Sequence, residues 1–120
     1  MKKYEIPESE KRLAKIIWRH EPIHSGELVK LCEKEMQWKK STTYTILKKL
    51  CDKGIFQNQN AVVTSLLKKE EFHAEQSREF IEDTFGGSLP KFIASFIGGK
   101  KLSRKEAEEL KRLIDEYKEN

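Results

Sequence analysis

The side chains in this chain best suited to chemistry lie in residues 38–54, with the sequence WKKSTTYTILKKLCDKG. The spacing there predicts an amphipathic helix whose inner side is formed by Thr43, Ile46, Leu47 and Leu50. The other side carries hydroxyls, a phenol and lysines, with no acid before Asp52. Hydroxyl and phenol groups hydrogen-bond to bases and phosphates, and lysine neutralises phosphate, so we predict a helix that contacts DNA. The predicted contact residues are Lys39, Lys40, Ser41, Thr42, Tyr44, Thr45, Lys48, Lys49 and Lys53.

Several of these residues have a second interpretation. Lys40 and Thr42 stand at the start of the helix, where a charge and a backbone N–H hold a phosphate, but Thr42 can equally cap the helix. Lysines on any surface look alike, so the competing interpretation of the whole outer face is a solvated helix surface. Trp38 is expected to fill the core at the turn before the helix rather than to stack on a base.

Two further helices are expected before this one. The first begins near Pro7, whose fixed φ suits the first helical position, and ends before Pro22, because the residue before a proline avoids the helical region. The second helix follows an N-cap at Ser25. The third helix, residues 40–53, is the DNA-contacting one, and Gly54 ends it.

A small hairpin is expected next. Two β-type runs, residues 55–57 and 61–66, flank Asn58-Gln59-Asn60, which predicts a tight connection between two strands. Three helices followed by a hairpin are the order of a winged helix, whose third helix enters the major groove while the hairpin touches the backbone. We therefore predict a mainly α fold with a small β-hairpin, in which residues 1–67 form a winged helix-turn-helix DNA-binding domain.

Residues 68–120 are expected to form three helices, each with an apolar stripe. The first runs from about Lys68 to Phe85, the second follows an N-cap at Ser88, and the third follows a capping box that begins at Ser103. A segment of this size has too little volume to bury its stripes alone, so we predict a dimerisation domain that pairs with a second copy of the chain. The predicted dimerisation residues are Phe80, Phe85, Leu89, Phe92, Ile93, Phe96, Ile97, Leu110, Leu113, Ile114 and Tyr117.

Composition agrees with a basic DNA-binding half. The chain has 120 residues and a net charge of +4; residues 1–67 hold 13 Lys and Arg against 8 Asp and Glu, whereas residues 68–120 hold 11 against 12. No apolar run suggests a membrane span or a signal peptide, and two cysteines make no disulfide framework, so we expect a cytoplasmic protein with reduced thiols. Pro22 separates His20 from His24, which speaks against a metal site, and we expect no cofactor and no enzyme activity.

The order and spacing of these elements resemble the BlaI/MecI repressors, the penicillinase repressor family, over nearly the full length. The resemblance lies in Ile16-Ile17-Trp18, in the run from Trp38 to Lys53-Gly54, in residues 85–96, and in Leu102-Ser103 with Glu108-Glu109-Leu110. It implies a homodimeric winged-helix repressor of palindromic operators that control β-lactam-resistance or related genes. In the best-known members a membrane sensor detects β-lactam and leads to cleavage of the repressor in its dimerisation part. The matching bond here is Ser95–Phe96.

Three departures from the family pattern keep alternatives open. The hairpin is shorter than usual and has no Lys, Arg or Tyr between Gly54 and Lys68. Lys11 stands where most members have a large apolar residue, and Ser95 replaces an Asn. A copper-responsive branch of the family carries a Cys-x-Cys pair near its C-terminus, and no cysteine lies beyond Cys51 here, which speaks against a copper response. The alternatives are a dimeric winged-helix module for protein interaction and a repressor without protease-driven induction.

Overall fold

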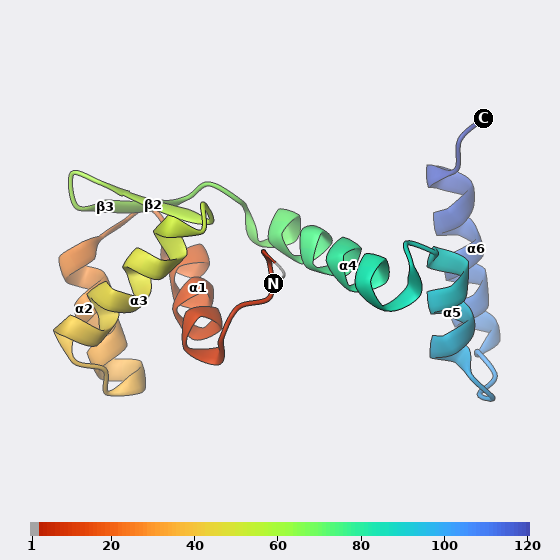
Figure 1. The fold of residues 1–120 in the computed structure, drawn as a ribbon, viewed down its shortest axis with the longest axis horizontal. Helices are drawn as coiled ribbons and strands as arrows, with labels where there is room; N and C mark the ends of the chain where they lie inside the picture. The colour runs from red at the N-terminus through yellow and green to blue at the C-terminus, as the bar shows by residue number, and fades with distance from the viewer. Residues whose placement is uncertain (1–2) are drawn as a thin grey trace. The chain divides into compact units, whose positions relative to one another are not determined.

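A computed structural model describes residues 3–120 and has the predicted order of elements (Figure 1). The chain is mainly α with one small antiparallel sheet, and its first part is a winged helix, as expected from the sequence. The helices are α1 (Glu8–His20), α2 (Ser25–Met36), α3 (Lys40–Asp52), α4 (Lys69–Phe85), α5 (Leu89–Ile97) and α6 (Arg104–Tyr117), and the strands are β1 (Ile23–His24), β2 (Phe56–Gln59) and β3 (Val62–Ser65).

The sheet has three strands in the order β1-β3-β2, where the sequence predicted only the hairpin. The additional strand, β1, pairs with β3 through Ile23 opposite Val63 and His24 opposite Val62. Two residues carry no alternation of polar and apolar side chains, so no periodic signal marks β1 in the sequence. This strand fixes the start of α2 to the hairpin.

The hairpin turn lies later than predicted. Gln59 pairs with Val62, so the turn consists of Asn60 and Ala61, and the expected connection at residues 58–60 is wrong. Both turn residues have a positive φ, 53° and 64°, as a two-residue turn between twisted strands requires. Asparagine tolerates this region, whereas alanine is strained there.

Replacing Ala61 with Gly is expected to stabilise the chain by about 0.5–1 kcal/mol. The left-handed conformation costs a residue with a Cβ about 1–2 kcal/mol, and the added freedom of glycine in the unfolded chain returns only about 0.4–1 kcal/mol. The same change at Ala74, inside α4, is the matched control and should destabilise by about 1 kcal/mol. Urea denaturation of both variants measures the effect, and equal destabilisation by both would contradict the argument.

The ends of α2 differ from the expected caps. His24 is the N-cap, and its Nδ1 accepts a hydrogen bond from the Gly26 N–H at 3.0 Å. Ser25, the predicted cap, is the first helical residue and is buried. At the other end Gln37 adopts a left-handed conformation, with φ 57°. The Trp38 N–H then donates to the Cys32 carbonyl at 3.3 Å, which directs the Trp38 side chain back toward the core, as predicted.

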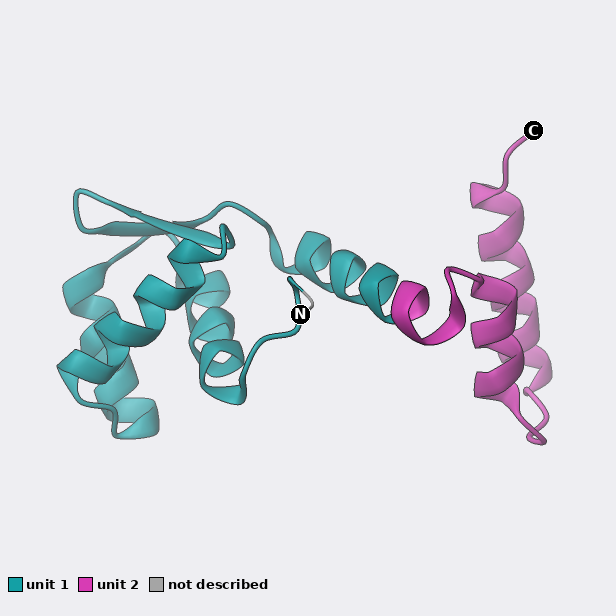
Figure 2. Ribbon diagram, viewed as in Figure 1, with its two compact units in different colours: residues 1–80 teal, residues 81–120 magenta. Residues whose placement is uncertain are grey.

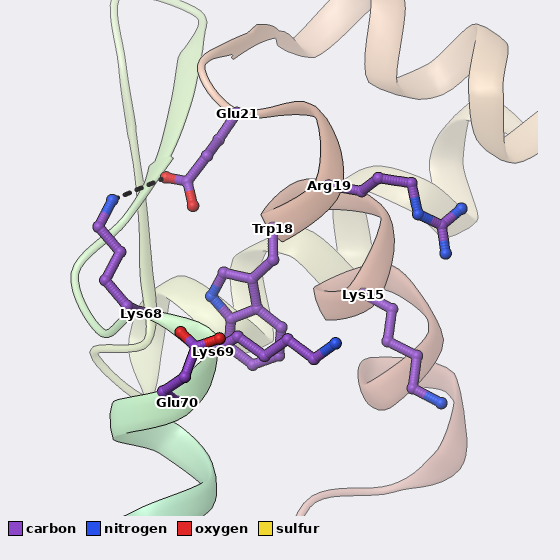
Figure 3. A pocket seen from close by; sticks show the side chains of 7 residues that line it. All are labelled: Lys15, Trp18, Arg19, Glu21, Lys68, Lys69 and Glu70. Carbon is purple, nitrogen blue, oxygen red and sulfur yellow. Dashed lines mark ion pairs between the residues drawn. The ribbon is translucent and has the colours of Figure 1, made fainter.

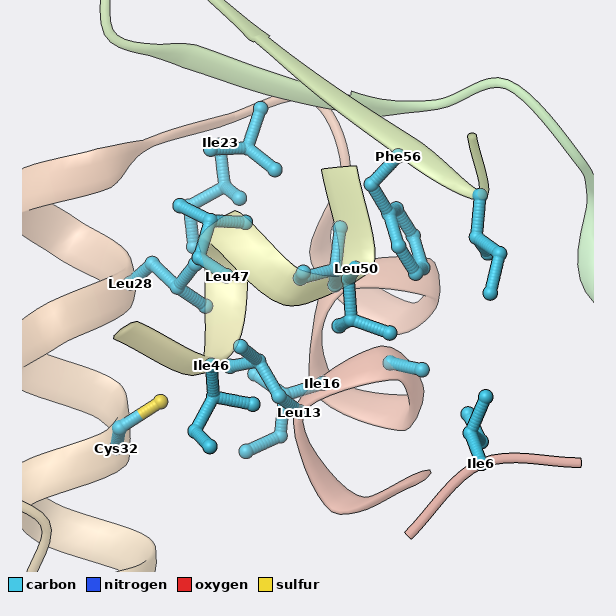
Figure 4. Packing of buried hydrophobic residues seen from close by; sticks show 14 of the residues in the cluster. Ile6, Leu13, Ile16, Ile23, Leu28, Cys32, Ile46, Leu47, Leu50 and Phe56 are labelled. Atoms are coloured by element: carbon cyan, nitrogen blue, oxygen red, sulfur yellow. The ribbon is translucent and has the colours of Figure 1, made fainter. Parts of the chain in front are cut away.

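The core lies where α1, α2 and α3 meet beneath the sheet (Figure 4). Its largest fully buried side chains come from all of these elements. They include Leu13, Ile17, Leu28, Leu50, Phe56 and Val63. After α3, Gly54 has φ 77° and the Ile55 N–H donates to the Leu50 carbonyl at 3.2 Å, which confirms the predicted helix stop.

The first compact unit extends to Phe80, because the beginning of α4 packs on the winged helix (Figure 2). Phe72 is buried, with its ring centroid 5.4 Å from that of Trp18 and 5.9 Å from that of Tyr4. The boundary between the two compact units lies within α4, between Phe80 and Ile81. Phe72 packs on the core, and further along α4 the Glu79 carboxylate accepts from the Tyr4 N–H at 2.8 Å, so contacts with the first unit continue almost to its end.

The second unit, residues 81–120, contains the end of α4 with α5 and α6. The predicted caps are present: Ser88 Oγ accepts from the Lys91 N–H at 3.2 Å, and Ser103 Oγ accepts from the Glu106 N–H at 3.1 Å. Neither α5 nor α6 has a buried residue in the single chain. Within residues 3–120, no helix is long and apolar enough to cross a membrane.

Candidate nucleic-acid interface

The two sides of α3 separate as the sequence predicts. Thr43, Ile46, Leu47 and Leu50 are buried against the core. Most of the predicted contact residues lie on the opposite side and are exposed to solvent. The exposed ones are Lys39, Lys40, Ser41, Thr42, Thr45, Lys48 and Lys49. Ser41, Thr45 and Lys48 share one line along the helix, because their spacing of four and three residues places them on the same face.

Tyr44 differs from its predicted place on the outer face. Its ring is half-buried against the core, and its hydroxyl donates to Ser25 Oγ at 3.1 Å. Ser25 is buried at the start of α2, so this bond fixes α3 to α2. The phenol oxygen is thus already engaged, and only the exposed part of the Tyr44 ring remains for contact with a ligand.

Lys53 is likewise engaged within the protein. Its Nζ lies 2.5 Å from Glu10 Oε1, and the Glu10 side chain on α1 is only 3% exposed. A carboxylate this deeply buried requires a partner, because removing a charge from water costs several kcal/mol. Lys53 therefore joins the end of α3 to α1, which gives it a structural role, and its contact with phosphate stays a prediction.

The remaining lysines are available for phosphate. Lys48 Nζ lies 3.0 Å from Asp52 Oδ2, but both side chains are more than 60% exposed, at 76% and 63%, so the pair contributes little. Within the described chain, Lys39, Lys40 and Lys49 have no ion-pair partner among the contacts found. No side chain caps the start of α3, so the expectation that Thr42 caps it is wrong, and the first-turn N–H groups remain open to an anion.

The hairpin presents amides rather than cations. Gln57 Nε2 donates to Thr64 Oγ1 at 3.1 Å across the two strands, while Asn58, Gln59 and Asn60 are exposed. A hollow of about 380 Å³ separates β2 from α3, and Asn58 lines it together with Tyr44, Leu47, Lys48 and Cys51. Sequence reasoning missed Asn58. The available signal was its spacing of two residues from Phe56, which turns both side chains to the same side of β2.

The cysteines are free, with Cys32 buried and Cys51 half-buried. Burial raises the pKa of the Cys32 thiol, aided by the nearby Glu35 carboxylate and opposed by a hydrogen bond with Thr43. Burial also raises the pKa of Cys51, and the neighbouring Asp52 adds to the rise while Lys48 opposes it. Both thiols therefore stay protonated near neutral pH, which makes them poor nucleophiles and poor metal ligands.

Comparison with known proteins supports the resemblance seen in the sequence. The family model described as "Penicillinase repressor" matches residues 6–116. The penicillinase repressor of Bacillus licheniformis is 28% identical over 118 residues, which cover 95% of this chain and 92% of that protein. The methicillin resistance regulatory protein MecI of Staphylococcus aureus is 24% identical, covering 95% and 96% of the two chains.

Among solved structures, the solution structure of the Bacillus licheniformis BlaI monomeric form in complex with the blaP half-operator matches with a TM-score of 0.48. It is 27% identical in sequence, and the match covers 56% of this chain and 87% of that one. The family model spans all six helices apart from the last residue of α6. The chain therefore belongs to the penicillinase repressor family.

Proposed function

We propose that this chain is a homodimeric, operator-binding transcriptional repressor that acts in the cytoplasm. The observation that carries the proposal is the exposed, acid-poor face of α3 in a member of the penicillinase repressor family. The relatives are named as repressors of penicillinase and as regulators of methicillin resistance, so related resistance genes are the expected targets. A repressor performs no chemistry on its ligand, and the proposal accordingly includes no enzyme activity.

In this proposal Ser41 and Thr45 face base edges, because they lie in the middle of the outer face of α3. Hydroxyls of this kind donate to or accept from bases. The phosphate partners are the lysines around them and the open N–H groups of the first turn. These are Lys39, Lys40, Lys48 and Lys49, with Thr42 beside them. The exposed part of the Tyr44 ring adds an apolar contact.

The partner surface for the second copy is the apolar face of α5 and α6. Leu89, Phe96, Leu113, Ile114 and Tyr117 are 52–76% exposed in the single chain, which is unusual for side chains of this size. A hollow of about 530 Å³ lies between the two helices. Its apolar lining includes Phe92, Ile93, Phe96, Ile97, Leu102, Leu110 and Leu113. Burial of this face in a symmetric dimer would present two α3 helices to a palindromic site.

Titration of labelled promoter DNA from the protein's own operon tests the operator claim. A specific repressor binds this DNA about a thousandfold or more tighter than a scrambled duplex of the same length. Both affinities should fall as salt rises, since each neutralised phosphate releases counterions. Equal affinity for the promoter and the scrambled duplex would exclude a specific repressor.

The Lys49→Ala variant is expected to reduce the salt dependence of DNA binding. Each phosphate contact contributes about 0.9 to the slope of log affinity against log salt, so the slope per chain should fall by about that amount. Lys11→Ala, an exposed lysine on α1, is the matched control and should leave the slope unchanged. Fluorescence anisotropy at several salt concentrations gives both slopes, and equal slopes for the native chain and Lys49→Ala would remove Lys49 from the interface.

The alternative function is that of a dimeric winged-helix module that binds other proteins and does not recognise operator DNA. The observation in its favour is the hairpin, which carries amides at its exposed end and no cation. This alternative predicts a stable dimer that shows no salt-dependent binding to DNA. The anisotropy titrations described above therefore decide between it and the repressor.

Proteolytic release forms the last part of the proposal. The candidate bond, Ser95–Phe96, lies inside α5, and Phe96 is 73% exposed in the single chain. A protease binds its substrate in extended form, so α5 must open locally before cleavage. A membrane sensor is expected to act on the repressor only indirectly. Mass spectrometry of the repressor from induced cells tests this: an intact Ser95–Phe96 bond together with derepression would favour a repressor without protease-driven induction.

A further inference from the structure

A pocket of about 370 Å³ lies beside Trp18, between α1 and the beginning of α4 (Figure 3). Its size falls within the range of small-molecule sites, about 300–1,000 Å³. It belongs entirely to the first compact unit, and none of its lining residues is among those predicted to contact DNA or the second copy. The lining residues are Lys15, Trp18, Arg19, Glu21, Lys68, Lys69 and Glu70.

The indole of Trp18 forms a fixed apolar wall of this pocket. Its Nε1 donates to the Leu67 carbonyl at 2.9 Å, so the only polar group of the ring is already bonded. The ring also packs on Phe56 and Phe72, with centroid distances of 5.2 and 5.4 Å. These contacts hold the indole in place, and what it offers a ligand is a flat π surface.

The charges around the indole are unevenly divided. Glu21 accepts from the Ser65 N–H and hydroxyl at 2.8 Å, and its carboxylate lies 3.6 Å from Lys68 Nζ. Burial alone would raise the pKa of Glu21, but the Ser65 hydrogen bonds and Lys68 outweigh it and hold that pKa below its ordinary value. The Glu21 carboxylate is therefore paired with Lys68 and Ser65, and it does not neutralise the other cations of the pocket.

The other cations reach to one side of the indole. Figure 3 shows Lys15, Arg19 and Lys69 extending there, on the side away from Glu21 and Lys68. In the described part of the chain, neither Lys15 nor Lys69 has an ion-pair partner among the contacts found, and Arg19 only approaches Glu35 at 4.0 Å. Against these three cations the pocket holds one further acid, Glu70. That side of the pocket thus has a net positive charge.

We propose that this pocket binds a small aromatic anion, a ring bearing a carboxylate or a phosphate. The ring stacks on the indole of Trp18, and the anionic group is bound by Lys15, Arg19 and Lys69. A planar guanidinium suits both carboxylate and phosphate, and the lysines add charge. Because Lys15 and Arg19 belong to α1 and Lys69 to α4, the bound anion links the winged helix to the helix that leads into the second unit. Binding of a small molecule at this site would therefore act directly on the contact between α1 and α4.

Tryptophan emission is the readout, with phenyl phosphate and benzoate as the probes. The chain has two tryptophans, so Trp38→Phe leaves Trp18 as the reporter. Saturable quenching by either probe, with inorganic phosphate and benzyl alcohol each binding at least about tenfold more weakly, is the expected result, because each of them lacks one of the two contacts. The tighter of the two probes identifies the anionic group. Since Trp38 packs on the core, the same titration is followed in the otherwise native chain by its two indole N–H resonances, of which only one should shift.

Lys15→Gln and Lys69→Gln are each expected to weaken probe binding about threefold to fivefold, the usual effect of one exposed charge pair. Lys11→Gln, one turn earlier on α1 and outside the pocket, is the matched control and should leave probe binding unchanged. Absence of saturation up to about 10 mM, a weak affinity even for a small ligand, would overturn the proposal. Equal loss in Lys11→Gln would also overturn it, as would a smaller salt slope for promoter DNA in Lys15→Gln or Lys69→Gln, because the pocket would then be a DNA contact.

Discussion

Lys53→Met is expected to lower the free energy of unfolding by about 3 kcal/mol. The substitution leaves the Glu10 carboxylate, which is only 3% exposed, buried between α1 and the end of α3 without its ion-pair partner. Breaking a buried pair from one side costs about 3–5 kcal/mol, and the 30% exposure of Lys53 places this pair at the lower end. Urea denaturation followed by circular dichroism measures the change.

The two partners of this pair are not equivalent. Glu10→Gln leaves Lys53 free to turn toward water, so it should cost only about 1 kcal/mol, the value of a lost hydrogen bond. The double variant Glu10→Leu with Lys53→Met removes both charges and should recover most of the stability. If the double variant is as unstable as the sum of Glu10→Leu and Lys53→Met measured singly, the pair is not the source of the effect.

Phe96→Asp is expected to convert the proposed homodimer into single chains. Burying a phenylalanine contributes about 2 kcal/mol, and the change removes one from each copy, so the loss is about 4 kcal/mol before the cost of the new carboxylate. This corresponds to about a thousandfold in the dissociation constant. Sedimentation velocity at micromolar concentration should show one chain for the variant and two for the native protein.

Arg112→Ala is the matched control for this experiment. Arg112 lies on the side of α6 opposite the stripe formed by Leu110, Leu113 and Tyr117, because successive residues turn by about 100° around a helix. Its removal should leave the dimer intact. If Phe96→Asp remains a dimer while circular dichroism shows unchanged helix content, α5 does not belong to the interface.

The sequence predicts best where one face of an element repeats over several turns. The inner side of α3, its stop at Gly54 and the caps at Ser88 and Ser103 follow from local spacing and local chemistry, and the structure contains all of them. Local rules decide these features because the partners lie within a few residues of each other.

Features that depend on distant partners could not be predicted in this way. Nothing local in the sequence distinguishes Lys53, which pairs with Glu10, from Lys49, which has no such pair, because the two partners stand 43 residues apart. The same holds for the Tyr44 hydroxyl, whose acceptor Ser25 lies in another helix. The sequence therefore predicts which residues of α3 lie outside its apolar side. That Lys53 and Tyr44 are bonded within the protein follows only from the tertiary structure.

The hairpin turn has a consequence for how the wing can change. The Ser25 N–H donates to the Ala61 carbonyl at 2.8 Å, and Ser25 Oγ accepts from Tyr44, so the turn, the start of α2 and α3 are bonded in series. An insertion at Asn60–Ala61 would break the first of these bonds and disturb the second. A longer wing tip would therefore disturb the contacts that orient α3, so the short hairpin and the position of α3 on the core depend on each other.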